Sequence, residues 1–372
     1  MRSAVQRPVS SAPTIDPGAA HAVNEPAVSI IVPVFNGAPL LGNAVSSVVR
    51  QRFQAWELLI LDDGSTDNSS GVAAEWVARD RRIRLVRSPS NRGIARTYNS
   101  GIQLSRGPLV LILHQDCALV GDDWLDRAIA SFDGPDCVAV VGSPLHNVGE
   151  MSSVEKLFWI IRSHTAATHP GGPAQVSERL FSENKCDLFR KDLLVELGGF
   201  DESLRWGGED QVLALRIRDK GLRIAQPPRL LFQAGLGSDR TIRQNLGKEW
   251  AYGFQMRAVV LHTELRALHR TGEGRLDPWL LNRLSVVGWV TWTVIFLLVG
   301  LLLDRPIIAL IALAGPLFRV VQLWVRGVRV RRAYCLGWAG VSAIGPLGLV
   351  ADLAYVVGTL SPPWSGASGS RG

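Results

Sequence analysis

Between residues 28 and 113 the chain alternates short apolar runs with stretches whose apolar residues recur at helical spacing. The apolar runs occupy residues 28–34, 56–61, 83–86 and 109–113, and helices are expected at 40–50, 69–78 and 94–104. Continuous apolar, β-branched runs are typical of strands buried on both faces of a parallel sheet. Such strand–helix–strand units predict an α/β fold with a doubly wound, mainly parallel sheet flanked by helices.

Polar side chains follow three of these strands. They are Asn36 after the first strand, Asp62 and Asp63 after the second, and His114, Gln115 and Asp116 after the fourth. Ligands of such sheets bind beyond the carboxyl ends of the strands. Acidic groups there suit a nucleoside and a divalent cation that neutralises a diphosphate. A turn with a helix cap explains any one of these loops equally well, but all three in phase with the sheet favour a nucleotide site.

A second acidic loop, Trp206-Gly207-Gly208-Glu209-Asp210, lies further along the chain. Its glycines allow a close backbone approach, and its tryptophan offers a stacking surface for a sugar ring. An inverting group transfer needs a base beside the acceptor hydroxyl. We interpret Asp210 as that base and Glu209 as the better helix cap, although a capping role for Asp210 itself is the alternative.

Six ordered segments resemble family 2 glycosyltransferases, which have the GT-A fold and use nucleotide-sugar donors. The segments are residues 28–36, 61–67, 91–101, 113–116, 198–202 and 208–210. The resemblance spans about residues 27 to 260. It therefore implies a GT-A domain, and C-terminal transmembrane helices are expected after it from the apolar composition of the last third of the chain.

The resemblance also implies roles for single residues on the donor side. Pro33 and Asn36 would lie in the loop that contacts the nucleotide. Asp63 would hydrogen-bond the nucleobase with support from Asp62. Arg92 or Arg96 would approach the diphosphate, and Gln115 would also contact the donor.

On the metal and acceptor sides, Asp116 matches the last acid of the DxD motif, which binds Mn²⁺ or Mg²⁺. Asp210 matches the catalytic base and Glu209 its neighbour, while Trp206, Gly207 and Gly208 belong to the acceptor side. Asn184–Asp187 and Arg190 are further candidate acceptor-side groups.

Two positions depart from the family's metal-binding pattern. His114 stands where the family has the first acid of DxD, and Gln233 stands where many relatives place a histidine ligand. A neutral imidazole can ligate a borderline metal but brings no negative charge. Metal binding then rests on Asp116 and the diphosphate oxygens. His114 is either a ligand or a side chain packed at a strand end.

The remaining segments are interpreted from composition. We expect a disordered tail at 1–26, the GT-A domain at 27–235, an amphipathic juxtamembrane helix region at 236–282, a transmembrane region at 283–361 and a tail at 362–372. The apolar stretches 284–303, 306–325 and 336–360 predict about three spans. Arg319 and Asp352 lie in different spans, and we expect them either to pair or to leave Arg319 at the interface. Trp279, Trp289, Trp324, Trp338 and Trp364 are expected as interface anchors.

The arginine-rich loop 326–332 is predicted to face the cytoplasm by the positive-inside rule. This places the enzyme domain in the cytoplasm, on a multi-pass inner-membrane protein. The net charge of +7 is thus read as attraction to a membrane rather than to nucleic acid. Four scattered cysteines without a CxxC pair predict neither a zinc site nor a disulfide framework.

The sequence therefore predicts an inverting, metal-dependent glycosyltransferase that acts on a lipid-linked or cell-envelope glycan. The chain has no Gln-x-x-Arg-Trp motif, which marks processive synthases of the family, so transfer of one or a few sugars is expected. The alternative is a catalytically inactive membrane protein that binds nucleotide sugars. A flippase or channel role is disfavoured, because the spans contain only one candidate charge pair.

Overall fold

The computed structural model describes residues 25–145, 151–162, 177–179, 184–204, 207–235, 240–262, 278–332 and 336–360. These residues form two compact units. One comprises Met1–Leu145, Gly171–Arg205 and Glu209–Leu236, and the other His146–Pro170, Trp206–Gly208 and Gly237–Gly372. His146, His164, His169 and Cys335, which the sequence left without a role, lie outside the described residues.

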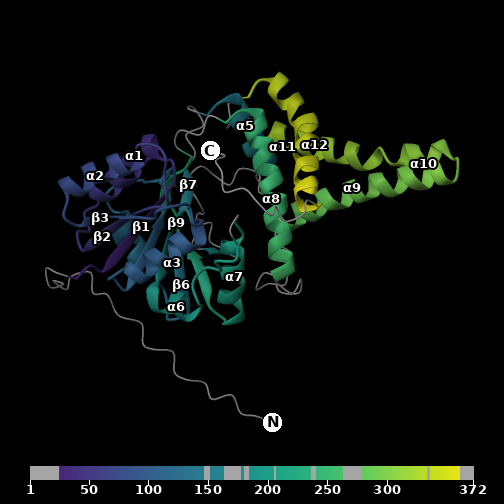
Figure 1. The fold of residues 1–372 in the computed structure, drawn as a ribbon. Helices are drawn as coiled ribbons and strands as arrows, with labels where there is room; N and C mark the ends of the chain where they lie inside the picture. Colours follow the sequence, from purple (N-terminus) through teal and green to yellow (C-terminus); the bar gives the residue numbers. More distant parts are fainter. Residues whose placement is uncertain are drawn as a thin grey trace, which may run out of the picture. The chain divides into compact units, whose positions relative to one another are not determined.

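The first unit contains an eight-stranded sheet with the order β3-β2-β1-β4-β9-β6-β10-β8 (Figure 1). Its strands are β1 (Val28–Val34), β2 (Trp56–Asp62), β3 (Ile83–Arg87), β4 (Leu109–Leu113), β6 (Cys137–Val141), β8 (Ser177–Arg179), β9 (Cys186–Arg190) and β10 (Arg223–Gln226). The first four run parallel, as predicted. Strand β9 is antiparallel to both β4 and β6, so the sheet is mixed in its second half.

Helices cover both faces of this sheet and bury two separate apolar clusters. On one face α1 (Ala38–Val49), α2 (Ser69–Arg79) and α4 (Trp124–Ala130) pack over alternate strand residues such as Ile30 and Val32. On the other, α3 (Ile94–Leu104), α6 (Lys191–Glu196) and α7 (Glu209–Asp219) pack over residues such as Ile31 and Leu59. This alternation is what a strand buried on both faces requires. The unit is thus an α/β/α sandwich of GT-A type.

A small second sheet joins β5 (Ala118–Leu119), β11 (Leu231–Gln233) and β7 (Ser143–Leu145) in the order β5-β11-β7. Gln233 lies opposite Ala118 in the register, two residues after Asp116. Gln233, which stands where many relatives of the family have a histidine, thus lies beside the loop after β4.

The second unit is helical. It contains α5 (Ser153–Arg162), α8 (Ile242–His262), α9 (Pro278–Leu302), α10 (Pro306–Ile311), α11 (Ala314–Val330) and α12 (Trp338–Leu360). Side chains of α5, α11 and α12, among them Phe158, Leu323 and Ile344, form a third buried apolar cluster. Helix α5 falls in a segment for which the sequence showed no consistent period.

One helix in the described part of the chain, α12, is long and apolar enough to cross a membrane. The prediction of about three spans is therefore supported at one of its three positions. Helix α9 contributes a shorter apolar stretch, Gly288–Leu302. The expected second span at 306–325 is wrong as a single helix, because the chain forms α10 and α11 with a turn at Ala312 and Leu313 between them.

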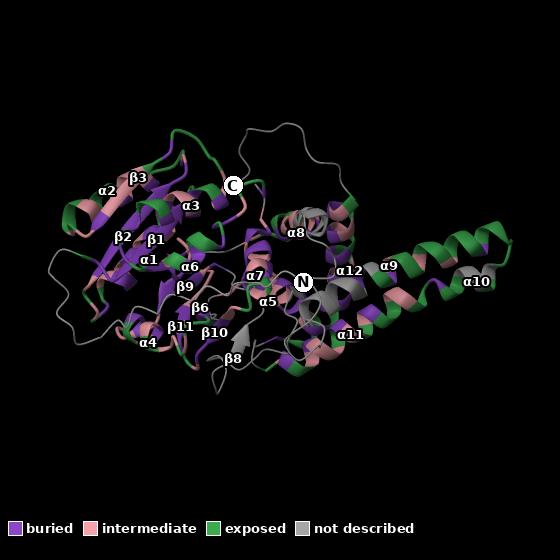
Figure 2. Cartoon of the chain, turned by 90° about the horizontal axis from the view of Figure 1, so that it is seen from below, coloured by how far each residue is buried: buried purple, intermediate pink, exposed green. Residues whose placement is uncertain are grey.

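Helix α9 and the α10–α11 segment form a hairpin whose outer part is exposed and apolar (Figure 2). The indole of Trp292 donates to the carbonyl of Ile311 at 3.1 Å, which joins the two arms. Leu301, Leu302 and Ile307 near the hairpin turn are 74%, 82% and 75% exposed. A surface of this kind marks an interaction site with an apolar partner.

Helix α8 packs closely against α12 in the same unit. A Cβ placed on Gly253 would lie 1.8 Å from the carbonyl oxygen of Tyr355, and one on Gly358 would lie 1.9 Å from that of Trp250. The backbones of α8 and α12 are therefore in contact, and the two helices run antiparallel. Small residues permit such close approach.

Arg319 and Asp352 pair, as one of the two alternatives anticipated. Nε of Arg319 lies 2.7 Å from Oδ2 of Asp352, and both side chains are buried. The indole nitrogen of Trp289 donates to the same Oδ2 at 3.2 Å, so α9, α11 and α12 meet at this pair. Trp289 is consequently a buried contact and not an interface anchor. Trp324 and Trp338 are exposed, and Trp279 and Trp364 lie where no side chain is described.

Candidate active site

The loops after β1 and β2 are held together by side-chain hydrogen bonds. Asn36 accepts the backbone N–H of Thr66 at 2.8 Å, and its own N–H donates to Ser65 Oγ at 3.0 Å. Asp62, the last residue of β2, is buried and accepts the N–H of Ser65 at 2.8 Å. Its supporting role in the turn is therefore visible in the structure. Asn36 has φ = 49°, a conformation that asparagine tolerates better than most residues.

Pro33 is not a loop residue, contrary to the sequence prediction. It lies buried inside β1 and pairs in register with Leu61. The pairing of β1 with β4 ends at Ile31. Beyond that point one edge of β1 has no strand partner, and a residue without an N–H is tolerated there.

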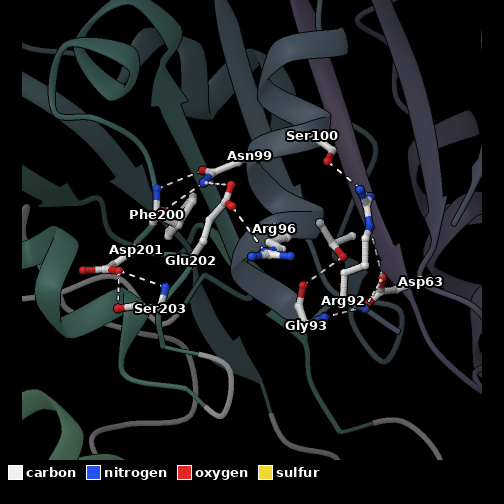
Figure 3. Close-up of polar contacts among 11 residues, drawn as sticks. Asp63, Arg92, Gly93, Arg96, Asn99, Ser100, Phe200, Asp201, Glu202 and Ser203 are labelled. Atoms are coloured by element: carbon white, nitrogen blue, oxygen red, sulfur yellow. Dashed lines mark hydrogen bonds and ion pairs between the residues drawn. The ribbon is translucent and has the colours of Figure 1, made fainter. Parts of the chain in front are cut away.

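The Asp63 carboxylate binds the segment that leads into α3 (Figure 3). It accepts the backbone N–H of Arg92 at 3.0 and 3.1 Å and that of Gly93 at 3.0 Å. Asp63 is buried at the end of β2, and Gly93 has φ = 92°, which a residue with a side chain rarely adopts. The carboxylate is thus fixed before any nucleobase binds.

The two candidate diphosphate arginines differ in their surroundings. The Arg92 guanidinium lies 4.0 Å from Asp63, and one of its nitrogens donates to Ser100 Oγ at 3.4 Å. Arg96 pairs with Glu202 at 3.3 Å, and both side chains are about half exposed (Figure 3). An exposed pair contributes little stability and exchanges easily with an incoming anion. Arg96 is therefore the more readily available cation for a diphosphate.

The loop after β4 contains His114, Gln115 and Asp116 in sequence. The amide of Gln115 bridges to the backbone of Phe35, with N–H to Oε1 at 3.1 Å and Nε2 to the carbonyl at 3.2 Å. Gln115 therefore ties the loop after β4 to the loop after β1. Its contact with the donor remains a prediction.

His114 lies between a phenol and a carboxylate. Its Nε2 lies 2.5 Å from the hydroxyl of Tyr98 on α3, and its Nδ1 lies 3.9 Å from Oδ1 of Asp116. Both His114 and Asp116 have side chains that are nearly a third exposed. Tyr98 is fully buried, and its ring packs at a tilt against that of Phe200, with the ring centroids 4.8 Å apart. Tyr98, whose buried ring packs against Phe200, therefore fixes the position of the imidazole.

The pair His114 and Asp116 fits a divalent cation as two ligands of a larger set. Two donors that each lie about 2.1 Å from one ion are at most about 4.2 Å apart, and the observed separation of 3.9 Å falls within that limit. Among the described residues no group of three His, Cys, Asp or Glu side chains could hold a metal. The remaining ligands would then come from diphosphate oxygens and water.

The turn before α7 is anchored to α3. Asn99 Nδ2 donates to the carbonyl of Phe200 at 2.8 Å, and Asn99 Oδ1 accepts the N–H of Phe200 at 2.9 Å. A Cβ on Gly199 would lie 2.6 Å from that Oδ1, so the glycine makes room for the contact. Glycine at position 199 thus allows the backbone to lie close to the side-chain amide of Asn99.

Helix α7 begins at the two acids, and the preceding glycines adopt the expected conformations. Gly207 and Gly208 have φ = 113° and 93°, while Trp206 lies outside the described residues. Glu209 is buried, and its Oε2 has no hydrogen-bond partner among the described groups. Burial, followed by the charge of Asp210, raises the pKa of Glu209 to about 8. Glu209 is therefore a buried acid at the first position of α7.

Asp210 lies one residue further along α7 and is partly exposed, with Oδ1 2.8 Å from the N–H of Gln211. Burial raises the pKa of Tyr98 well above its usual value, and the charges of Glu209 and Asp210 raise it further. Tyr98 thus lies within electrostatic reach of both acids while it contacts His114. The loop after β4 therefore contacts a hydroxyl whose pKa the two acids at the start of α7 affect.

Tyr98 and Asn99 were not singled out from the sequence. Asn99 lies three residues after Arg96 on α3, which is the spacing of two residues on one helix face, whereas Tyr98 has no such relation to Arg96. Arg190, a candidate acceptor group, lies elsewhere. It is paired with Leu109 at the start of β4, whereas His114 follows the end of that strand.

Comparisons with known proteins show which sequences and folds this chain is similar to. The sequence model of glycosyl transferase family 2 matches residues 29–177. An uncharacterized glycosyltransferase of Haemophilus influenzae is 34% identical over 107 residues, covering 29% of this chain and 42% of that protein. Glycosyltransferase AglE of Haloferax volcanii is 22% identical over 283 residues, covering 76% and 83%.

Among solved structures, the mannosyltransferase PcManGT from Pyrobaculum calidifontis is similar in fold. It superposes with a TM-score of 0.54 at 19% identity, over 94% of this chain and 91% of that one. The chain spans less than half the length of several curated relatives that it matches, with 42%, 38% and 28% covered. The sequence model of glycosyl transferase family 2 thus matches the segment that carries β1 to β7 and the loops after β1, β2 and β4.

Proposed function

We propose that the chain transfers a sugar from a nucleotide-sugar donor to an acceptor hydroxyl, with inversion at the anomeric carbon. The observation that carries the proposal is the position of Tyr98, which contacts His114 and lies within electrostatic reach of Glu209 and Asp210. A group transfer requires a donor site and a base that are held close to each other. The family match supports the same reading.

The donor end is assigned to the loops after β1, β2 and β4. Asp63 accepts a hydrogen bond from the nucleobase, Asn36 shapes the loop against it, and Arg96 leaves Glu202 to bind the diphosphate. Asp116, with His114, holds the cation. A bound Mn²⁺ or Mg²⁺ would neutralise the charge of the departing diphosphate. PcManGT was solved with GDP-Man and Mn²⁺, which is consistent with these assignments.

The chemical step is assigned to Asp210. Its carboxylate accepts the proton of the acceptor hydroxyl while that oxygen forms the new bond to the anomeric carbon. The bond between the anomeric carbon and the diphosphate oxygen breaks, and the nucleoside diphosphate leaves with that electron pair. Glu209, whose pKa is raised to about 8, remains protonated near neutral pH and is unsuited to be the base.

We further propose that the acceptor is a lipid-linked or cell-envelope glycan and that transfer is non-processive. The apolar α12 and the exposed apolar hairpin of α9, α10 and α11 support attachment to a membrane. In this proposal the chain is a multi-pass protein of the cytoplasmic membrane, with the catalytic unit on the cytoplasmic side, where nucleotide sugars occur. The arginines of the 326–332 segment support that orientation.

The donor is identified by a thermal-stability screen of nucleotide sugars with the full chain. A hit that stabilises the wild type and not Asp63→Ala identifies the donor and assigns Asp63. Asp210→Asn should then retain donor binding and lose transfer by several orders of magnitude. Full transfer activity in Asp210→Asn would overturn the mechanism.

A second candidate function is binding of nucleotide sugars without catalysis, which the presence of His114 and Gln233 favours. Such a protein would show the same thermal shift with the donor and no turnover with Mn²⁺. Release of the nucleoside diphosphate from purified protein therefore separates the two functions.

A further inference from the structure

The environment of His114 defines what this side chain can do. Its Nε2 is 2.5 Å from the Tyr98 hydroxyl, and its Nδ1 is the ring nitrogen nearer to Asp116, at 3.9 Å from Oδ1. Tyr98 is buried and its ring packs on Phe200, so the hydroxyl cannot swing away. The imidazole therefore has Nε2 on the fixed Tyr98 hydroxyl and Nδ1 toward the Asp116 carboxylate.

A tyrosine hydroxyl is both a donor and an acceptor, and this matters for the histidine tautomer. When the Tyr98 hydroxyl accepts from Nε2–H, the lone pair of the neutral ring lies on Nδ1, the atom nearer to Asp116. Nδ1 can then bind a cation together with the Asp116 carboxylate. A partner that fixes one ring nitrogen is what orients ligating histidines in metalloproteins.

The chemistry of this donor pair differs from that of two carboxylates. Mg²⁺ is a hard ion that prefers oxygen and binds through carboxylates, phosphates and water. An imidazole nitrogen suits first-row transition metals better than it suits Mg²⁺. Replacing one acid by an oriented imidazole therefore changes which cation the loop after β4 prefers.

We propose that Tyr98 positions His114 as a nitrogen ligand and that this pair makes the site select a transition-metal dication such as Mn²⁺ over Mg²⁺. The proposal rests on the proposed function for the presence of a diphosphate-bearing donor. The ligand assignment is tested by spectroscopy without turnover, so that it and the enzymatic function can fail separately.

The experiment is pulsed EPR on the full chain loaded with Mn²⁺ in the presence of UDP or GDP, whichever raises the melting temperature. Coupling of the Mn²⁺ electron spin to an imidazole ¹⁴N nucleus is expected in the wild type and not in His114→Asp. Competition of Mn²⁺ with Mg²⁺ gives the selectivity. It should be lost in His114→Asp, because the variant replaces the nitrogen ligand that favours a transition metal by a carboxylate oxygen, which suits Mg²⁺.

Tyr98→Phe keeps the ring on Phe200 and removes only the hydroxyl. It should weaken Mn²⁺ binding by about 10-fold and leave Mg²⁺ binding nearly unchanged. Tyr252→Phe, which removes a hydroxyl from α8 in the other unit, is the matched control and should behave as wild type.

No ¹⁴N coupling in the wild type, or coupling that persists in His114→Asp, overturns the ligand assignment. Equal selectivity in Tyr98→Phe and Tyr252→Phe overturns the role of Tyr98. If the coupling is present but no donor is turned over, the metal assignment stands and the proposed transfer reaction fails.

Discussion

The side-chain amide of Asn99 binds the backbone of Phe200, 101 residues further along, through two hydrogen bonds of 2.8 and 2.9 Å (Figure 3). The amide acts as donor and acceptor at the same residue, as a neighbouring strand would. Helix α3 is thereby fixed to the turn that leads into α7. The same helix contacts Asp63 at its start and His114 through Tyr98, so it joins the three loops of the proposed site.

Asn99→Ala should remove both bonds and leave the Phe200 backbone groups without a side-chain partner. We expect a loss of about 2 kcal/mol in the free energy of unfolding, measured by denaturant unfolding. The kcat of transfer should fall more than the donor KM changes, because the turn leads to Asp210. The exposed Asn43→Ala is the control and should change stability by less than about 0.5 kcal/mol. Equal stability of the two variants would contradict the structural role of Asn99.

Arg319→Met should destabilise the helical unit strongly. It leaves the Asp352 carboxylate buried with only the Trp289 indole as a described hydrogen-bond donor, and loss of one partner from a buried pair costs about 3–5 kcal/mol. The double variant Arg319→Met, Asp352→Leu should recover most of that loss, because no buried charge remains. Thermal unfolding in detergent measures both.

The matched control for the buried pair is Arg52→Met, which breaks the exposed pair with Asp122, where the side chains are 71% and 50% exposed. Its cost should stay below about 1 kcal/mol. A double variant as unstable as Arg319→Met alone would show that the helices need the charges themselves. An unpaired buried charge would then not explain the loss of stability in Arg319→Met.

The first half of the sheet could be predicted closely because each strand there is a local signal. Strands at residues 28–34 and 109–113 and the helix at 94–104 lie where the apolar spacing placed them. Strand β9 could not be found this way. Its five residues pair with β4 and β6, which precede it by many residues, and its direction is set by those long-range partners. The position and direction of β9 are therefore determined by its contacts in the fold and not by a local sequence pattern.

The site was predictable where a loop directly follows a strand and less so where a helix contributes from the side. Asp63 and Asp116 follow strand ends, and the alternation of elements placed both at one edge of the sheet. Tyr98 and Trp289 are aromatic residues on helices, and a sequence pattern does not show which polar group each one meets. The burial of Glu209 could not be predicted, because it depends on packing of α7 against the sheet, which the local sequence does not encode.

Glu209 should make stability depend on pH. Its pKa is raised from 4.5 to about 8, so between these values the folded chain holds a proton that the unfolded chain has released. The free energy of unfolding should therefore fall as the pH rises through this window, by about 1.4 kcal/mol for each unit of pKa difference. Glu209→Gln mimics the protonated acid and should remove this slope. Parallel pH profiles of wild type and variant, measured by thermal unfolding, would contradict the assignment.

The α9–α11 hairpin should bind lipid through its exposed apolar residues. Leu302 is 82% exposed near the turn, and a charge placed in a bilayer core costs about 3 kcal/mol. Leu302→Asp should therefore lower the fraction of the chain that co-floats with phospholipid vesicles. Val195→Asp changes an exposed valine on α6 of the other unit, 57% exposed, and should have no such effect. Equal flotation of the two variants would mean that the hairpin does not enter the bilayer and that its apolar face meets a protein partner instead.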